Sequence, residues 1–133
     1  MKLTTQSEYS LLILLYLARN YGDDYISLSK ITQKHHLPFK YMERLMHVMT
    51  SAGVVNSLKG RHGGYRLAHR PEEITVAKVI RLMDGPLAPI DSVSRYFYKP
   101  TVIDKEKKLI GIMKDIRNYI SLKLESTTLK NIC

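Results

Sequence analysis

The sequence lacks most of the chemistry that disulfide bonding, metal binding or catalysis would need. Its single cysteine, Cys133, is the last residue, which excludes an internal disulfide framework and most thiolate metal sites. The five histidines show no HxxxH or HxxH spacing. No GxSxG motif, phosphate-binding P-loop or pair of carboxylates at helical spacing is present. We therefore expect no metal, no cofactor and no catalytic residues, and the chain is not expected to be an enzyme.

Long hydrophobic runs are also lacking. The longest, LLILLYLA at residues 11–18, is far too short to cross a bilayer. Glu8 precedes this run and no small-residue cleavage site follows it, which argues against a signal peptide. With 133 residues, 44% of them hydrophobic, the chain is predicted to fold as one domain, or as one domain with a helical extension. We expect it in the cytoplasm, without a membrane partner.

Acidic residues are scarce in the part of the chain where basic residues gather. Residues 27–70 hold eight Lys or Arg but only one acid, Glu43, so this segment carries +7 of the formal net charge of +9. All five histidines lie in the same segment. Such concentrated positive charge favours a polyanionic partner, although charge alone also fits a solvated basic surface.

Capping signals and hydrophobic periodicity predict a mostly α-helical fold. Thr5 and Glu8 form a capping box for a first helix that we expect to be buried on nearly all sides. Ser27 caps a second, short helix, and Pro38 starts a third helix that ends at Gly53. Two short helices joined by a tight turn are typical of a helix-turn-helix.

The third predicted helix has one apolar and one polar face. The apolar residues fall at intervals of three and four and are expected to face the core: Met42, Leu45, Met46 and Met49. The opposite face carries Lys40, Tyr41, Glu43, Arg44 and His47.

A β-hairpin is predicted directly after this helix-turn-helix. The segments VVNSL and YRLA read as two short strands around the loop KGRHGG. The order of helix, helix-turn-helix and hairpin is typical of a winged helix, whose second paired helix enters the major groove of DNA. In the wing, Lys59, Arg61 and His62 supply cations. The glycines, Gly60, Gly63 and Gly64, are expected to allow positive φ and close approach of the backbone to the sugar-phosphate surface.

The polar side chains of the third helix suit contacts with DNA. Arg44 is expected to donate two hydrogen bonds to a guanine edge, and Lys40 is expected to neutralise a phosphate. Tyr41 either donates to a phosphate or packs on a sugar. Glu43 either accepts a hydrogen bond from a cytosine amino group or pairs with a neighbouring base such as Lys40 or His47. We favour the pairing, since acidic contacts to bases are less common.

The C-terminal part is predicted to hold a long helix. Thr75 caps a helix that Gly85 ends, and a proline-containing loop follows. From about residue 103 to about 125, one apolar stripe is formed by Leu109, Met113, Ile116, Ile120 and Leu124, with Ile112 and Tyr119 beside it. This stripe is expected to be buried by the protein's own body or by a second copy. We favour the second copy, because symmetric dimers are the commonest oligomers.

These patterns divide the chain into three parts. Residues 1–85 form a winged helix-turn-helix DNA-binding domain, residues 86–102 a loop, and residues 103–133 a dimerisation helix and tail. Tyr96, Phe97 and Tyr98 in the loop are expected to be packing residues rather than a ligand site. Cys133 either oxidises across a dimer or is an inert thiol, and we favour the inert thiol.

Five segments resemble the Rrf-two family of bacterial winged-helix regulators. They are KLTTQSEYSLLILLYLA, SLSKI, KYMERLMHVMTSAGVV, KGRHGGYRLA and PEEITVAKVIRLMDGPL, and they follow one another over residues 1 to about 90. The resemblance implies a dimeric transcription regulator, usually a repressor, whose long C-terminal helix crosses onto its partner. It also implicates the amino terminus in phosphate contacts. The expected DNA-binding residues are Lys2, Thr4, Ser27, Lys40, Tyr41, Glu43, Arg44, His47, Lys59, Arg61, His62, Gly63 and Gly64.

The chain departs from that family in one respect. Members that carry an iron–sulphur cluster place three cysteines in the loop after the DGPL-like segment, where this sequence has none. Some relatives use an acid of the first helix as a ligand, but the capping role of Glu8 explains that residue without a metal. We therefore expect no iron–sulphur cluster.

Two functions remain open from the sequence. The favoured one is a sequence-specific regulator that binds double-stranded DNA as a homodimer on a palindromic operator. The alternative is a protein-interaction module that docks a partner enzyme through the C-terminal stripe or the loop 86–102. The signal that switches the protein would be either a small molecule in the cleft between the body and the long helix, or another protein.

Overall fold

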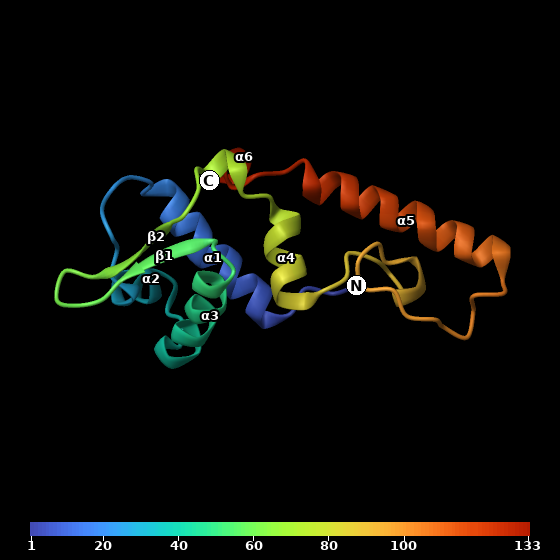
Figure 1. Cartoon of the computed structure of the whole chain (residues 1–133), viewed down its shortest axis with the longest axis horizontal. Coiled ribbons are helices and arrows are strands. Elements are labelled where there is room, and N and C mark those ends of the chain that lie inside the picture. Colours follow the sequence, from blue (N-terminus) through green and yellow to red (C-terminus); the bar gives the residue numbers. More distant parts are fainter.

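The structure, a computed structural model that describes residues 1–133, consists of helices and one two-stranded sheet. In chain order the elements are α1 (Thr5–Arg19), α2 (Leu28–His35), α3 (Phe39–Ser51), β1 (Val55–Leu58), β2 (Gly64–Leu67), η1 (Pro71–Glu73), α4 (Val76–Asp84), η2 (Asp91–Val93), α5 (Lys107–Glu125) and α6 (Leu129–Ile132). The molecule is elongated, with the hairpin at one end and α5 reaching the other (Figure 1). This order confirms the predicted mostly α-helical winged helix with a long C-terminal helix.

The first helix is capped by Thr4 and not by Thr5 as predicted. The Thr4 hydroxyl accepts a hydrogen bond from the Ser7 N–H at 3.4 Å. Thr4 also donates to the carboxylate of Asp84 at the end of α4, through its backbone N–H at 3.1 Å and through its hydroxyl. This contact across 80 residues fixes Thr4 in the extended conformation that a cap requires. No residue from 9 to 18 is exposed, as predicted for this helix.

The inward face of α3 is confirmed. Met42, Met46 and Met49 are fully buried and Leu45 nearly so. These side chains share one apolar cluster with residues of α1, α2, the hairpin, α4 and α6. Because α3 is anchored along its whole apolar face, the opposite face is held rigidly toward solvent.

The hairpin is also hydrogen-bonded to the segment that leads into α2. Strands β1 and β2 pair antiparallel, with Val55 opposite Leu67 and Leu58 opposite Gly64. Ile26, just before α2, adds a further bridge to Tyr65. The Ile26 N–H donates to the Tyr65 carbonyl at 2.9 Å, and the Tyr65 N–H donates to the Ile26 carbonyl at 2.8 Å.

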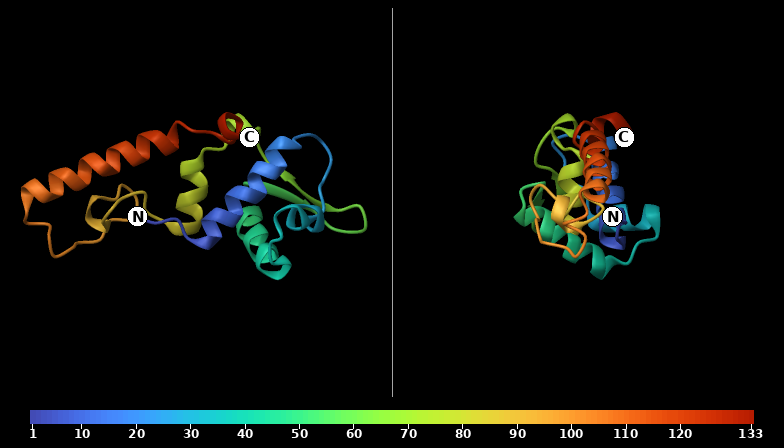
Figure 2. Two further views of the ribbon diagram at one scale, coloured as in Figure 1. Left: turned by 180° about the vertical axis from the view of Figure 1, so that it is seen from behind. Right: turned by 90° about the vertical axis from the view of Figure 1, so that its right-hand side faces the viewer.

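The long helix α5 begins at Lys107, four residues after the predicted start. The Asp104 carboxylate accepts hydrogen bonds from the Thr101 N–H at 3.0 Å and the Thr101 hydroxyl at 2.8 Å. Such a side-chain-to-backbone bond closes a turn that competes with helix formation. Figure 2, seen from behind, shows α5 extending beyond the helical body alongside the loop that links α4 to α5. No helix combines the length and the hydropathy that crossing a bilayer requires.

After α5 the chain returns to the winged helix, which the sequence analysis did not predict. The Val76 N–H donates to the Thr127 carbonyl and the Leu129 N–H to the Ile74 carbonyl, both at 2.9 Å. Leu129 itself is fully buried in the main cluster. A helix of four residues is too short to give a periodic signal, so only the tertiary contacts reveal it.

Removing the Leu129 side chain should therefore destabilise the winged helix. We expect Leu129→Ala to lower the free energy of unfolding by about 2–5 kcal/mol, as for other leucines truncated in a core. Urea denaturation followed by circular dichroism measures this. Ile132→Ala is the control, because Ile132 lies on the same short helix but is 42% exposed. Equal stabilities of the two variants would contradict the buried role of Leu129.

Candidate nucleic-acid interface

The outer face of α3 carries charged side chains that point into solvent. The Lys40 side chain is 95% exposed, and Arg44 and His47 are exposed as well. Lys40 Nζ lies 3.9 Å from Glu43 Oε1, so Glu43 makes the pairing that the sequence favoured. An exposed pair of this kind contributes only about 0–1 kcal/mol. Both side chains can therefore separate at little cost when a ligand approaches.

The ring of Tyr41 lies between Arg44 and the aromatic ring of Tyr9. The half-buried Tyr41 ring meets the Tyr9 ring edge-on, with centroids 5.8 Å apart and an interplanar angle of 79°. The guanidinium of Arg44 lies over the Tyr41 ring, 5.3 Å from its centroid. Stacking on an aromatic face restricts the rotamers of Arg44. The N–H donors of its guanidinium group are thereby held away from the core.

One groove runs between α3 and the hairpin. It has a volume of about 480 Å³ and is lined by Glu43, His47, Thr50, Ser57, Leu58, Lys59, Gly60, Gly63, Gly64 and Tyr65. Burial and, to a smaller extent, the Glu43 carboxylate raise the pKa of the Tyr65 hydroxyl. Tyr65 therefore keeps its proton and can act as a hydrogen-bond donor in this groove. The polar face of α3 and the base of the wing thus border the same space.

The wing presents cations that no acidic side chain neutralises. Lys59, Arg61 and His62 are exposed, and none of them belongs to any of the four ion pairs of the chain. Gly60 has φ +108° with open space around it, so it supplies the predicted turn.

The other two wing glycines serve a purpose that the sequence analysis did not recognise. A Cβ on Gly63 would collide with the backbone carbonyl of Leu58, and one on Gly64 with the backbone carbonyl of Ile26. Close approach of the backbone is needed within the protein itself, where Ile26 bridges to β2. These contacts within the protein are sufficient to require glycine at both positions, and a role of either glycine at the DNA surface stays a prediction.

Adding a methyl group at Gly64 should loosen the wing. We expect Gly64→Ala to cost at least about 1–3 kcal/mol of stability, since the backbone around Ile26 must shift to accept it. Gly22→Ala is the matched control, because its Cβ would meet nothing within 4 Å. Thermal unfolding of both variants measures the difference, and an unchanged Gly64→Ala protein would contradict the packing described.

The DNA-binding residues predicted at the amino terminus and at the start of α2 lie away from this groove. The donors of Thr4 are used by Asp84. Residues on either side of Lys2, Met1 and Leu3, line an apolar groove with α5. Ser27 occupies the cap position of α2, but its side chain makes no capping hydrogen bond. The structure therefore does not bring these three residues into the groove between α3 and the hairpin. Five other predicted residues do not line it either: Lys40, Tyr41, Arg44, Arg61 and His62. Lys40 and Arg44 line a neighbouring hollow on α3, which shares Glu43 and His47 with the groove.

The structure divides the predicted dimerisation stripe. Ile120 and Leu124 pack against the chain's own small cluster of Val76, Ala77, Ile80 and Leu87, and the Arg81–Glu125 ion pair at 2.6 Å fixes α5 in that orientation. Leu109 and Met113 are half-buried. Four large apolar residues of α5 remain exposed: Ile112, Ile116, Tyr119 and Leu122. The exposed face thus shares Ile116 with the predicted stripe and includes Ile112 and Tyr119, which the sequence placed beside it; Leu122 was not predicted.

A helix-turn-helix with a basic solvent-facing second helix, bordered by a cationic wing, defines a winged-helix DNA-binding protein. Within that class the chain belongs to the Rrf2 (Rrf-two) family, whose model, described as "Iron-dependent Transcriptional regulator", matches residues 3–133. The resemblance found in the sequence is thereby confirmed, and the function at this level is that of a DNA-binding transcriptional regulator.

Similar proteins are named as HTH-type transcriptional regulators. The HTH-type transcriptional regulator CymR of Bacillus subtilis is 33% identical over 132 residues, which are 99% of this chain and 89% of the relative. The structure of CymR, the global cysteine regulator of B. subtilis, aligns with a TM-score of 0.86 at 32% identity, over 99% of this chain and 95% of CymR. The HTH-type transcriptional regulator NsrR of Shouchella clausii is 27% identical over 133 residues, covering 99% of this chain and 88% of the relative.

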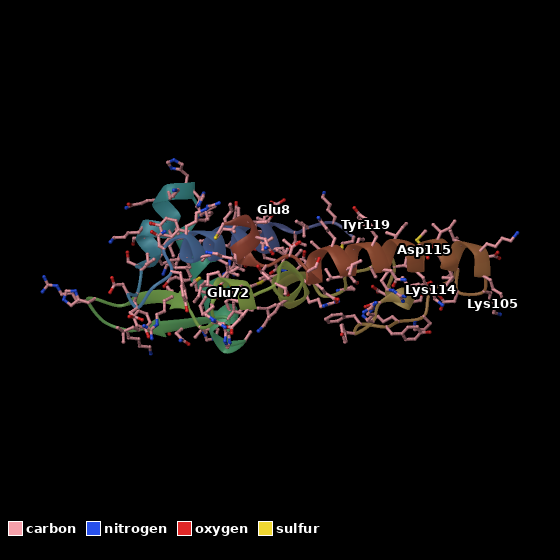
Figure 3. The ribbon with its side chains drawn as sticks, turned by 90° about the horizontal axis from the view of Figure 1, so that it is seen from above. Glu8, Glu72, Lys105, Lys114, Asp115 and Tyr119 are labelled. Carbon is pink, nitrogen blue, oxygen red and sulfur yellow. The ribbon has the colours of Figure 1, made fainter.

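The donor atoms of this chain do not fit an iron–sulphur cluster, although the family model is described as iron-dependent. The loop between α4 and α5 contains no cysteine, and the one thiol, Cys133, is exposed at the end of the chain. No three His, Cys, Asp or Glu side chains are grouped so that they could hold a metal ion. Glu8 lies in the first turn of α1, as Figure 3 shows, without such neighbours. Thiolates are the ligands on which these clusters depend.

Proposed function

We propose that this protein is a homodimeric repressor that binds a palindromic operator through α3 and the wing, without an iron–sulphur cluster. The observation that carries the proposal is the groove shared by α3 and the hairpin. A helix that enters the major groove and a wing that follows the neighbouring backbone must face the same duplex. In this proposal Arg44 reads a base edge, while Lys40, Lys59 and Arg61 neutralise phosphates.

The exposed apolar face of α5 supports the dimer. Ile112, Tyr119 and Leu122 are 55%, 73% and 72% exposed, and Ile116 is 41% exposed. The groove formed by Met1 and Leu3 against α5 continues this apolar surface toward the body. Soluble proteins seldom leave such a contiguous patch uncovered, and a second copy offers the same surface in return. The repressor role follows from the family resemblance, whose members usually repress.

Selection of duplexes from a randomised pool tests the proposal. We expect the protein to enrich a palindrome whose half-sites lie about one helical turn, or a multiple, apart. Three phosphate contacts in each of two protomers should give a slope of log K against log salt of about −5. No preference for a palindrome over random duplex, together with a nearly flat salt dependence, would contradict DNA recognition by this surface.

One observation in the loop between α4 and α5 favours the alternative function, a module that docks a partner enzyme. Tyr96 and Tyr98 are 67% and 63% exposed, so the expectation that they are packing residues is wrong for most of their surface, whereas Phe97, 41% exposed, is buried over the larger part of its surface. The Arg81 guanidinium lies 4.8 Å from the centroid of the Tyr96 ring, and the Phe97 N–H donates to the Ser94 hydroxyl at 3.1 Å.

A pair of variants separates the two functions. Arg44→Ala combined with Lys59→Ala should abolish regulation if the protein acts on DNA. Phe97→Ser combined with Tyr98→Ser should abolish it if the protein acts by docking an enzyme. A reporter gene under a selected operator measures both, and we expect only the first pair to derepress it.

A further inference from the structure

A small pocket lies where the loop between α4 and α5 meets α5, far from the wing. Its volume is about 180 Å³, and it is lined by Ser92, Tyr98, Asp104, Ile110 and Lys114. Figure 3 shows Lys114 on the edge of α5 next to this loop, and Tyr119 on the other edge. The pocket is therefore separate from the exposed apolar face of α5 and from the groove between α3 and the hairpin.

The pocket contains one carboxylate and one ammonium group, and neither has an ion-pair partner in the chain. The four ion pairs of the protein include neither Asp104 nor Lys114. Asp104 is held in place by the N–H and the hydroxyl of Thr101. Hydrogen bonds from Ser92 first, and then from Thr101, lower the pKa of Asp104, so its carboxylate is ionised at neutral pH. Two opposite charges thus border one cavity without neutralising each other.

We propose that this pocket binds a small zwitterion, an α-amino acid whose ammonium group pairs with Asp104 and whose carboxylate pairs with Lys114. The Tyr98 hydroxyl offers a further hydrogen bond to that carboxylate, and Ile110 gives an apolar wall for a short side chain. A ligand with a single charge would leave either Asp104 or Lys114 without a partner. A zwitterion satisfies both at once, through charge-assisted hydrogen bonds.

The size of the pocket limits the ligand. Its volume of about 180 Å³ equals roughly six water molecules at about 30 Å³ each, which suits a molecule of about six to eight non-hydrogen atoms. Alanine and serine have this size, whereas nucleotides and larger cofactors do not fit. The pocket joins the loop to α5, so a bound amino acid would fasten the free end of that helix. This site goes beyond the proposed function and does not depend on DNA binding.

Titration of the ¹⁵N-labelled protein with L-alanine and L-serine, followed by amide chemical shifts, tests the proposal. We expect saturable shifts at Ser92, Asp104 and Lys114 below about 50 mM, since a ligand of this size should bind in the millimolar range. Propionate and ethylammonium, each with one of the two charges, should give no saturable shift. Lys114→Gln should weaken binding by about 10- to 100-fold, and Asp104→Asn by a similar factor.

Lys108→Gln is the matched control, since Lys108 is an exposed lysine of α5 that does not line the pocket. Asp104→Asn also removes one of the two oxygens that accept hydrogen bonds from Thr101, so Lys114→Gln, which leaves the turn intact, decides the question. Absence of saturation with both amino acids would overturn the proposal. Equal shifts with propionate, or unchanged binding in Lys114→Gln, would overturn it as well. Binding of the selected operator, measured on the same variants without amino acid, reports separately on the DNA interface.

Discussion

Replacing Arg44 with alanine should weaken binding to a selected operator by about 5- to 150-fold, the loss expected when one bidentate contact to a guanine edge is removed. Arg44 is exposed on the outer face of α3, and stacking over the Tyr41 ring holds its guanidinium. Because no acidic side chain pairs with Arg44, its removal leaves no charge unbalanced within the protein. Fluorescence anisotropy at a fixed salt concentration measures the affinity.

Two further variants serve as comparisons for Arg44→Ala. Lys78→Ala removes the same charge from the exposed side of α4 and should leave the affinity almost unchanged. Lys59→Ala, in the wing, should weaken binding to all sequences alike and reduce the salt slope by about 1 for each protomer. A loss in Arg44→Ala no greater than in Lys78→Ala would contradict the role of α3 as the reading helix.

Replacing Ile116 with glutamate should convert the proposed dimer into a monomer. Ile116 lies at the centre of the exposed apolar face of α5, and a carboxylate buried there without a partner would oppose association. Since the two reading helices are then no longer linked, affinity for the palindrome should fall by about 10²- to 10⁴-fold. Sedimentation velocity measures the change of mass.

Asn118→Glu is the matched control for this second result. It introduces the same charge at an exposed position of α5 that lies outside the exposed apolar set. Ile116 is 41% exposed in the single chain, so the variant should keep its helical circular dichroism. An Ile116→Glu protein that remains dimeric would show that another surface holds the two copies together.

Local patterns predicted the parts of the fold that local forces decide. The spacing of Met42, Leu45, Met46 and Met49 identified the buried face of α3, and with it the solvent-facing set that carries the DNA-binding proposal. The capping residue Thr75 was also correct, since its side chain accepts a hydrogen bond from the Lys78 N–H at 3.1 Å. In each case the signal lies within one or two helical turns.

The features that the sequence did not reveal depend on residues far apart in the chain. Asp84 decides that Thr4, and not Thr5, caps α1. Ile26 explains why Gly64 must lack a side chain, although the sequence suggested a role at the DNA surface. No periodicity within one segment carries information about such partners.

The apolar stripe of α5 is another feature whose partners the sequence did not reveal. Periodicity places residues on a helix face but does not say which neighbour covers that face. The ion pair between Arg81 and Glu125 and the packing of Ile120 and Leu124 on α4 orient the helix toward its own body. As a result, Ile112, Ile116 and Tyr119 are left for a partner, whereas Ile120 and Leu124 are not.

The most direct test of the account is the change in backbone amide shifts and hydrogen exchange when a selected operator duplex is added to the intact protein. The central claim is that α3 and the wing bind one duplex together. It predicts that residues 39–48 and 57–65 change together, at the same protein-to-DNA ratio, while residues 91–106 do not. Changes confined to residues 91–106, or changes in α3 without any in the hairpin, would contradict it.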